Sequence, residues 1–217
     1  MTTRPDRVER PDPFAARTIV PYALTVFLLD TLAGWEIEYG TVFSSTTTRL
    51  LDAFEVAGTA IFVLATIAVI VATATGRYHL RSRAVIAYLV VATFQALAAV
   101  AALVVTGHTR DDAYLWGLWD LAAAYLMVVA VFTGWYWFCD HAISGGAFVF
   151  PARDGERAPA PRLIDYVFIA FNTNATFGPT TESVVSRRVK ALMMLQTAMS
   201  LALLLVLVAR VVSIARG

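Results

Sequence analysis

The stretch LIDYVFIAFNTNATFGPT (residues 163–180) decides the fold. Its first nine residues are largely apolar, polar Asn and Thr residues lead from there to Gly178, and a long apolar run follows at residues 189–214. The apolar part is too short to cross about 30 Å of hydrocarbon as a helix. A short helix that enters a membrane can return as non-helical backbone only where that backbone is buried in protein or lines a watery cavity. The stretch therefore predicts a re-entrant pore loop, and the residues alone leave open a surface helix that ends in a Thr-Gly-Pro turn.

The composition of the whole chain indicates a polytopic membrane protein. Of the 217 residues, 59% are hydrophobic and only 15% are charged. The apolar residues form blocks about 20 residues long, which is the length of a transmembrane helix. The basic residues are scattered in short loops and form no basic face or binding motif. We therefore expect a lipid bilayer around the chain and no nucleic acid.

The apolar runs predict an all-α membrane protein with five transmembrane helices and a re-entrant pore helix and loop between the last two. The expected spans are residues 18–35, 53–75, 84–106, 114–138 and 189–214, with a basic turn at residues 77–83. The first run contains Pro21 and Asp30, so it predicts either a crossing or a helix lying partly in the interface.

Three parts are expected along the chain. Residues 1–17 carry three prolines and charges of both signs without an apolar core, which predicts a disordered N-terminal tail. Residues 18–110 hold the first three helices. Residues 111–217 form a pore-like module of the fourth helix, the re-entrant segment 163–182 and the fifth helix.

A few polar and aromatic residues inside the spans also carry predictions. Asp30 and Asp120 are the ionisable residues deepest in the expected spans, and each is either functional or close enough to an interface to reach water or an arginine. Other conspicuous polar residues there are Glu55, Gln95 and Gln196. The aromatic residues 135–138 are typical of a membrane–water interface.

The distribution of Lys and Arg predicts an orientation. If all five spans cross, thirteen of these residues lie on the side of the N-terminus and the re-entrant segment, and four lie on the other side. Since basic residues concentrate in cytoplasmic loops, this pattern places the N-terminus and the segment in the cytoplasm.

The stretch AFNTNATFG (residues 170–178) resembles the pore-helix end and selectivity filter of the potassium-channel superfamily. Residues 188–212 resemble the inner pore-lining helix of small bacterial channels and follow the filter without a gap. The layout is also similar to an uncharacterised family of bacterial five-span membrane proteins, a domain of unknown function with an aspartate-aromatic segment and a Ser-Arg-Arg turn, here Asp165-Tyr166 and Ser186-Arg187-Arg188. The resemblance covers residues 138–217.

The resemblance implies a set of pore residues, with departures from the potassium-channel pattern. Thr176 and Gly178 match the filter, whereas Pro179 and Thr180 stand where the channels have tyrosine and glycine. Pro179 lacks an N–H group to brace a filter, and Thr180 lacks the backbone freedom of glycine. We therefore expect a shorter, wider or less selective site. The implied filter residues are Thr173, Asn174, Ala175, Thr176, Phe177, Gly178, Pro179, Thr180 and Glu182, and those of the pore-lining helix are Gln196 and Ser200.

The resemblance and the charge pattern predict different orientations of the loop. Potassium-channel pore loops open to the outside, whereas the charges place this loop in the cytoplasm. The two agree if the first span does not cross, or if the pore is inverted as in glutamate-receptor channels, and we favour the inverted arrangement.

Together these patterns predict an ion-channel-like protein of the cell membrane, in bacteria the inner membrane. Four copies would form a homotetrameric pore that conducts a monovalent cation. The alternative is a non-conducting membrane scaffold or a small-solute transporter that keeps the pore-domain fold. No cofactor or metal is expected, and no enzyme activity, because the three histidines fall in separate loops and no catalytic motif is present.

Overall fold

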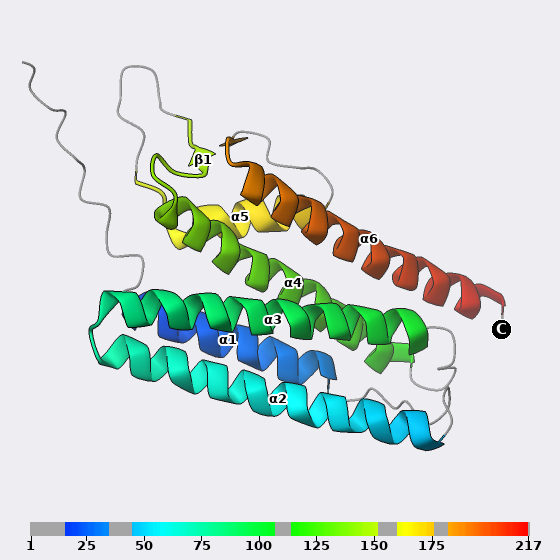
Figure 1. Cartoon of the computed structure of the whole chain (residues 1–217). Coiled ribbons are helices and arrows are strands. Elements are labelled where there is room, and N and C mark those ends of the chain that lie inside the picture. Colours follow the sequence, from blue (N-terminus) through cyan, green and yellow to red (C-terminus); the bar gives the residue numbers. More distant parts are fainter. Residues whose placement is uncertain (1–15, 35–44, 107–113, 152–159, 176–181, 217) are drawn as a thin grey trace, which may run out of the picture.

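The computed structural model describes residues 16–34, 45–106, 114–151, 160–175 and 182–216. These residues form a bundle of helices and one two-stranded sheet (Figure 1). The elements are α1 (Ala16–Gly34), α2 (Ser45–Ala74), α3 (Tyr78–Thr106), α4 (Tyr114–Ala142), β1 (Phe148–Val149), α5 (Leu163–Asn174), β2 (Ser183–Val184) and α6 (Arg187–Arg216). All the helices except α5 are long and apolar enough to cross a membrane. The five apolar helices expected from the sequence are confirmed, and they are compatible with a multi-pass membrane protein.

Helix α4 lies at the centre of the bundle. It contacts α1 and α3 on one side and α5 and α6 on the other. Within its apolar span 72% of the residues are buried, against 28% for α2 and for α6. Helix α2 packs on α1 and α3 at one edge, and α6 lies at the opposite edge (Figure 1). The chain therefore has two halves that share α4, and α3 of one half also contacts α6 of the other.

A glycine on α4 allows α1 to pack closely against it. A Cβ atom at Gly134 would lie 2.0 Å from the hydroxyl oxygen of Tyr22, so any side chain there would displace Tyr22. The Tyr22 hydroxyl donates a hydrogen bond to the carbonyl of Ala130, at 3.0 Å. Tyr88 of α3 is fully buried and donates to the carbonyl of Ala23, at 2.8 Å. Helix α1 thus lies alongside α2, α3 and α4 within the bundle.

The turn between α2 and α3 is shorter than expected. Helix α3 begins at Tyr78, so Arg81 and Arg83 lie on the helix and the expected basic turn at residues 77–83 is wrong. Arginine is a good helix former, and at a helix end its guanidinium group can reach water. Apolar runs alone therefore underestimate the length of such helices. Only residues 75–77 connect the helices, with Gly76 at φ +70°.

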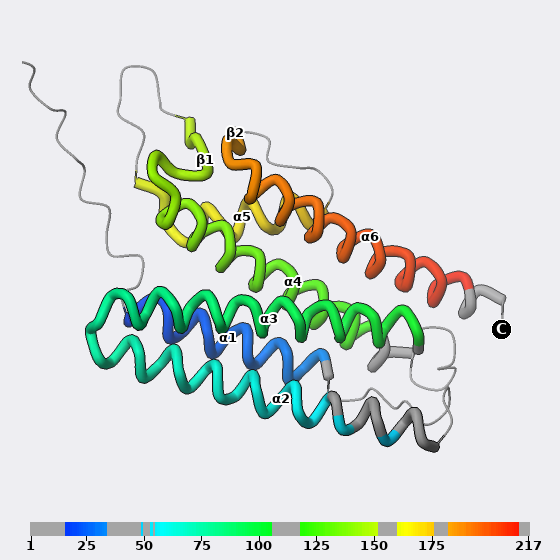
Figure 2. Tube along the Cα trace, in the orientation of Figure 1, coloured from blue at the N-terminus to red at the C-terminus, as the bar shows by residue number. Residues whose placement is uncertain are grey.

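Other boundaries also differ from the sequence-based expectation. Helix α2 begins at Ser45, eight residues before the apolar run, and α1 begins at Ala16 inside the expected tail. The rest of that tail lies outside the described residues. Strands β1 and β2 were not expected, and they pair antiparallel with Phe148 opposite Val184 (Figure 2).

Candidate functional site

Helix α5 is a short helix with both ends fixed by local hydrogen bonds. It follows Pro161, and the carboxylate of Asp165 in its first turn accepts a hydrogen bond from the backbone N–H of Arg162, at 2.6 Å. An acidic residue at this position satisfies a free N–H group and interacts favourably with the helix dipole. At the other end the N–H of Ala175 donates to the carbonyl of Phe171, at 2.9 Å. The expected short helix before the filter stretch is therefore present.

The beginning of α5 is attached to the end of α4 by Asp140. This buried carboxylate accepts hydrogen bonds from the backbone N–H groups of Ala147, at 2.6 Å, and Phe148, at 3.0 Å. Its other oxygen accepts a hydrogen bond from the hydroxyl of Tyr166, at 2.6 Å. One side chain thus joins α4, strand β1 and α5. We call this group the Asp140 clasp.

The end of α5 is held by a buried polar network between α4 and α6. The amide nitrogen of Gln196, fully buried on α6, donates to the carbonyl of Ala170, at 2.7 Å, and to the side-chain oxygen of Asn174, at 3.3 Å. That asparagine oxygen also accepts a hydrogen bond from Ser200. The Gln196 oxygen in turn accepts a hydrogen bond from the hydroxyl of Tyr136 on α4, at 2.5 Å. These groups form the Gln196 network.

The position of the network along α6 defines how far α5 extends into the bundle. Gln196 and Ser200 lie nine and thirteen residues beyond Arg187, which at 1.5 Å per residue is about 14 and 20 Å along the helix. The apolar span of α6 ends at Val212, so Ser200 is at its middle. Asn174 therefore lies beside the middle of α6, whereas the Asp140 clasp lies at the end of α4. Helix α5 runs between these two levels, next to α4 and α6 (Figure 1).

The structure brings together only part of the expected site. Thr173 and Asn174 are buried at the end of α5, and Ala175 is half-buried. The residues expected to form the filter itself, Thr176, Phe177, Gly178, Pro179 and Thr180, lie outside the described residues.

The other expected site residues lie beyond that stretch. Glu182 is half-buried, and one of its carboxylate oxygens is buried without a hydrogen-bond partner among the described residues. Gln196 and Ser200 both face Asn174 inside the chain. Of the two roles open to Gln196, hydrogen bonding across helices is observed, and lining a pore in an assembly stays a prediction.

Several residues that hold α5 were not expected from the sequence. The aromatic run at residues 135–138 predicts an interface position for Tyr136, but this side chain is fully buried and bonded to Gln196. Asp140 and Tyr166 were not singled out as a pair. Tyr136 and Asp140 lie four residues apart and thus on one face of α4. Two polar groups one turn apart on a largely apolar helix were the signal that could have revealed both.

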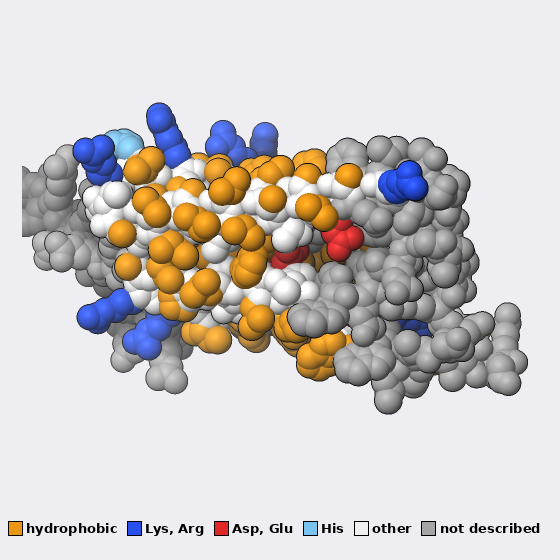
Figure 3. Space-filling model, turned by 90° about the horizontal axis from the view of Figure 1, so that it is seen from below, with side chains coloured by type: hydrophobic (Ala, Val, Ile, Leu, Met, Phe, Trp, Pro, Cys, Tyr) orange, Lys and Arg blue, Asp and Glu red, His pale blue; other side chains and the backbone are white. Residues whose placement is uncertain are grey.

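A second polar contact lies in the first half of the chain. Asp30 on α1 lies close to Gln95 of α3 and to Glu55 of α2. Figure 3 shows acidic side chains within a largely hydrophobic face of the molecule. A Cβ atom at Gly58 would lie 2.8 Å from the Gln95 side-chain oxygen, so α2 and α3 approach closely at this point. Asp120, the other deep carboxylate, is buried on α4.

Within the residues that the structure describes, no group of three or more His, Cys, Asp or Glu side chains is placed to hold a metal ion. Comparison of the chain with protein-family models, with curated proteins and with solved structures finds no match. The likeness to the potassium-channel superfamily therefore rests on the residues quoted for it.

Proposed function

We propose that the chain is a multi-pass protein of the cell membrane, in bacteria the inner membrane, and that residues 163–182 form a re-entrant segment. The observation that carries this proposal is the position of Asn174 beside the middle of α6. Both ends of the segment, by contrast, lie near the end of α4. The Asp140 clasp holds the beginning of α5 at the end of α4, and β2 pairs there with β1, directly before α6.

The proposed role of this segment is to form the constriction of a cation-conducting pore. Backbone carbonyls and threonine hydroxyls can replace the hydration shell of an ion, and acidic side chains at the entrance favour cations. The stretch from Thr176 to Thr180 carries these groups, and Glu182 supplies a carboxylate oxygen that the described part of the chain leaves without a hydrogen bond. The likeness of residues 170–178 to a potassium-channel filter supports the same function.

A single copy has one such loop, which cannot enclose a pore. Closed rotational assembly places equivalent loops around one axis. We therefore propose a homotetramer, as the potassium-channel likeness implies, with a monovalent cation as the permeating ion. In this proposal the Gln196 network fixes the depth of α5 in each subunit.

One observation favours a non-conducting scaffold or a small-solute transporter as the second candidate. Gln196 and Ser200, the expected pore-lining residues, are buried and hydrogen-bonded within a single chain. A pore between subunits is lined by residues at the surface of each chain. The module can therefore serve as a self-contained packing unit.

Ion flux into liposomes that contain the full chain tests the proposal. We expect the unmodified protein to conduct a monovalent cation, and the variants Gly178→Val and Thr176→Val to lose this flux while they elute as the native assembly. Thr25→Val is the matched control, because it makes the same change on an exposed part of α1. Unchanged flux in Gly178→Val would rule out the filter assignment, and an inactive wild-type protein would favour the scaffold or transporter.

A further inference from the structure

The short turn between α2 and α3 carries a concentration of positive charge. Arg77, Arg81 and Arg83 lie within seven residues, and the first turn of α3 contains no acidic residue. Arg77 and Arg83 are exposed, and their guanidinium groups make no hydrogen bond or ion pair with the described part of the chain. Two exposed arginines such as Arg77 and Arg83 attract an anion from outside these elements.

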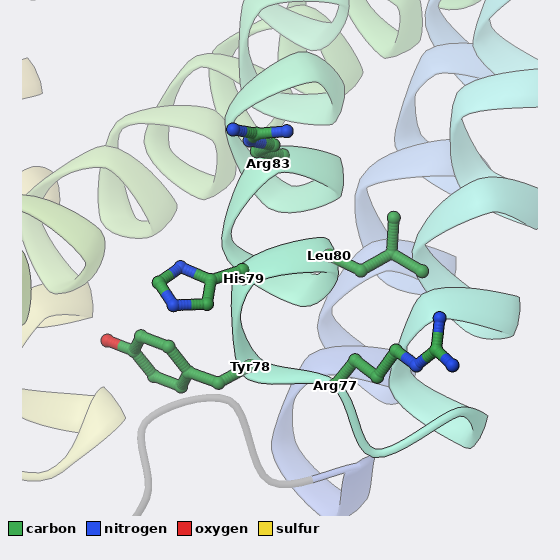
Figure 4. Close-up of a pocket in the computed structure, with 5 residues that line it drawn as sticks. All are labelled: Arg77, Tyr78, His79, Leu80 and Arg83. Carbon is green, nitrogen blue, oxygen red and sulfur yellow. The ribbon is translucent and has the colours of Figure 1, made fainter.

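The same residues line an open hollow at the beginning of α3. Arg77, Tyr78, His79, Leu80 and Arg83 surround about 460 Å³ (Figure 4). The Tyr78 and His79 rings lie on one side of the helix, and Arg77 and Leu80 lie on the other (Figure 4). Tyr78 is 52% exposed and Leu80 is 46% exposed. The hollow thus combines cationic groups with exposed apolar surface.

Neighbouring charges at this end of the bundle do not supply the missing anion. Basic residues predominate here and include Arg17, Arg162, Arg187, Arg188 and Lys190. Of the described acidic residues here, Asp140 is buried in its clasp, Asp165 accepts the hydrogen bond that begins α5, and Glu182 is half-buried directly before β2. The anion must therefore come from a molecule other than this part of the chain.

The position of the hollow identifies the class of that molecule. The apolar span of α2 ends at Ala74 and that of α3 begins at Tyr78, so the turn lies at the boundary between hydrocarbon and headgroups if these helices cross a bilayer. Basic pockets at such boundaries recognise phosphate headgroups. We propose that Arg77 and Arg83 bind the headgroup of an anionic phospholipid, and that Tyr78 and Leu80 contact its glycerol and the upper part of its acyl chains.

The inference rests on the proposed membrane placement and is independent of ion conduction. A protein that conducts no ions still has this lipid site. A chain that alkaline carbonate releases from membranes would contradict the membrane placement itself. An unmodified chain that stays in the membrane but binds anionic lipid no better than zwitterionic lipid would contradict only the lipid site.

Native mass spectrometry of the purified full chain in zwitterionic lipid–detergent micelles tests the site, with phosphatidylglycerol as the titrated lipid. Each basic side chain near an anionic surface contributes roughly 1 kcal/mol, and 1.4 kcal/mol is a factor of ten in affinity. We therefore expect the double variant Arg77→Gln/Arg83→Gln to bind phosphatidylglycerol about 25-fold more weakly. Both arginines are exposed, so the variant keeps its fold.

Two control variants distinguish a specific lipid site from a general effect of positive surface charge. Arg187→Gln/Lys190→Gln removes two exposed basic residues at the same end of the bundle, and Arg49→Gln removes one at the start of α2. We expect both to bind the lipid as the unmodified chain does. An equal loss of affinity in Arg187→Gln/Lys190→Gln would overturn the inference, because surface potential alone would then explain binding. Displacement of the lipid by an equal concentration of soluble glycerol phosphate would also overturn it.

Discussion

The two sides of α4 are both held by buried tyrosines, but the bonds differ in kind. On the side of α1, the Tyr22 hydroxyl donates to the carbonyl of Ala130, which already accepts a hydrogen bond within its helix. On the side of α5 and α6, the Tyr136 hydroxyl donates to Gln196, which donates onward to Ala170 and Asn174. The first hydrogen bond involves no further side chain, whereas the second is part of a series of hydrogen-bonded side chains. Removing a member therefore has different consequences on the two sides.

The two sides of α4 therefore differ in how far they depend on specific polar partners. A tyrosine bonded to a helix carbonyl can be replaced by phenylalanine without leaving a buried polar group unpaired. A member of a network cannot, since each removal leaves its neighbours unsatisfied. The two tyrosine bonds on the side of α1 thus add little to packing, whereas on the other side the network of hydrogen bonds holds α5.

The Asp140 clasp should give the largest effect. Asp140→Ala removes the acceptor of three buried hydrogen bonds, which two backbone N–H groups and the Tyr166 hydroxyl donate. We expect the free energy of unfolding in mixed micelles to fall by about 3–4 kcal/mol, because each unsatisfied buried group costs about 1–3 kcal/mol. A loss below about 1 kcal/mol would show that water replaces the clasp.

The Gln196 network comes next in expected effect. Gln196→Leu keeps the size of the side chain but breaks its bonds to Tyr136, Ala170 and Asn174. We expect a loss of about 2–3 kcal/mol in the free energy of unfolding, together with faster hydrogen exchange in α5. Met194→Leu, on the exposed face of α6, is the control and should change little. A Gln196→Leu variant with unchanged exchange in α5 would mean that the network does not hold this helix.

Tyr136→Phe separates one bond of this network from the rest. The variant keeps the buried ring and leaves only the Gln196 side-chain oxygen without its donor. We expect the free energy of unfolding to fall by about 1 kcal/mol, less than in Gln196→Leu. The double variant with Gln196→Leu should then be no less stable than Gln196→Leu alone, and additive losses would contradict a shared network.

The tyrosines on the side of α1 should give the smallest effects. Tyr22→Phe and Tyr88→Phe each remove one hydroxyl that donates to a helix carbonyl. Hydrogen bonds between membrane helices contribute about 0.6 kcal/mol on average, and we expect losses of this size in the same unfolding measurement. A loss in Tyr88→Phe as large as that in Gln196→Leu would remove the distinction between the two sides of α4.

Much of the architecture could be predicted from the sequence because apolar runs of bilayer length have few alternatives. The approximate bounds of α5 could also be predicted, since an apolar run between Pro161 and a group of Asn and Thr residues restricts where the helix can begin and end. The beginning of α3 could not, because arginines at a helix end break the apolar pattern without breaking the helix. The apolar pattern therefore locates a helix better than it locates its first turn.

The contacts of the candidate site were harder to predict from the sequence. Strands β1 and β2 have two residues each and no detectable alternation, and their pairing joins segments far apart in the chain. The partners of Asp140 and Gln196 depend on how α5 lies against α4 and α6, which no local pattern determines. Single polar residues within apolar helices indicated that partners exist, and the structure shows which ones they are.

The subunit count of the purified chain in a lipid nanodisc, measured by native mass spectrometry, tests the central proposal most directly. A pore made from one re-entrant loop per chain requires rotational assembly, and we expect four copies. A tetramer would agree with an arrangement in which the Asn174 residues of the four subunits surround a common axis. A stable monomer or dimer would leave the loop without a pore and contradict the proposed function.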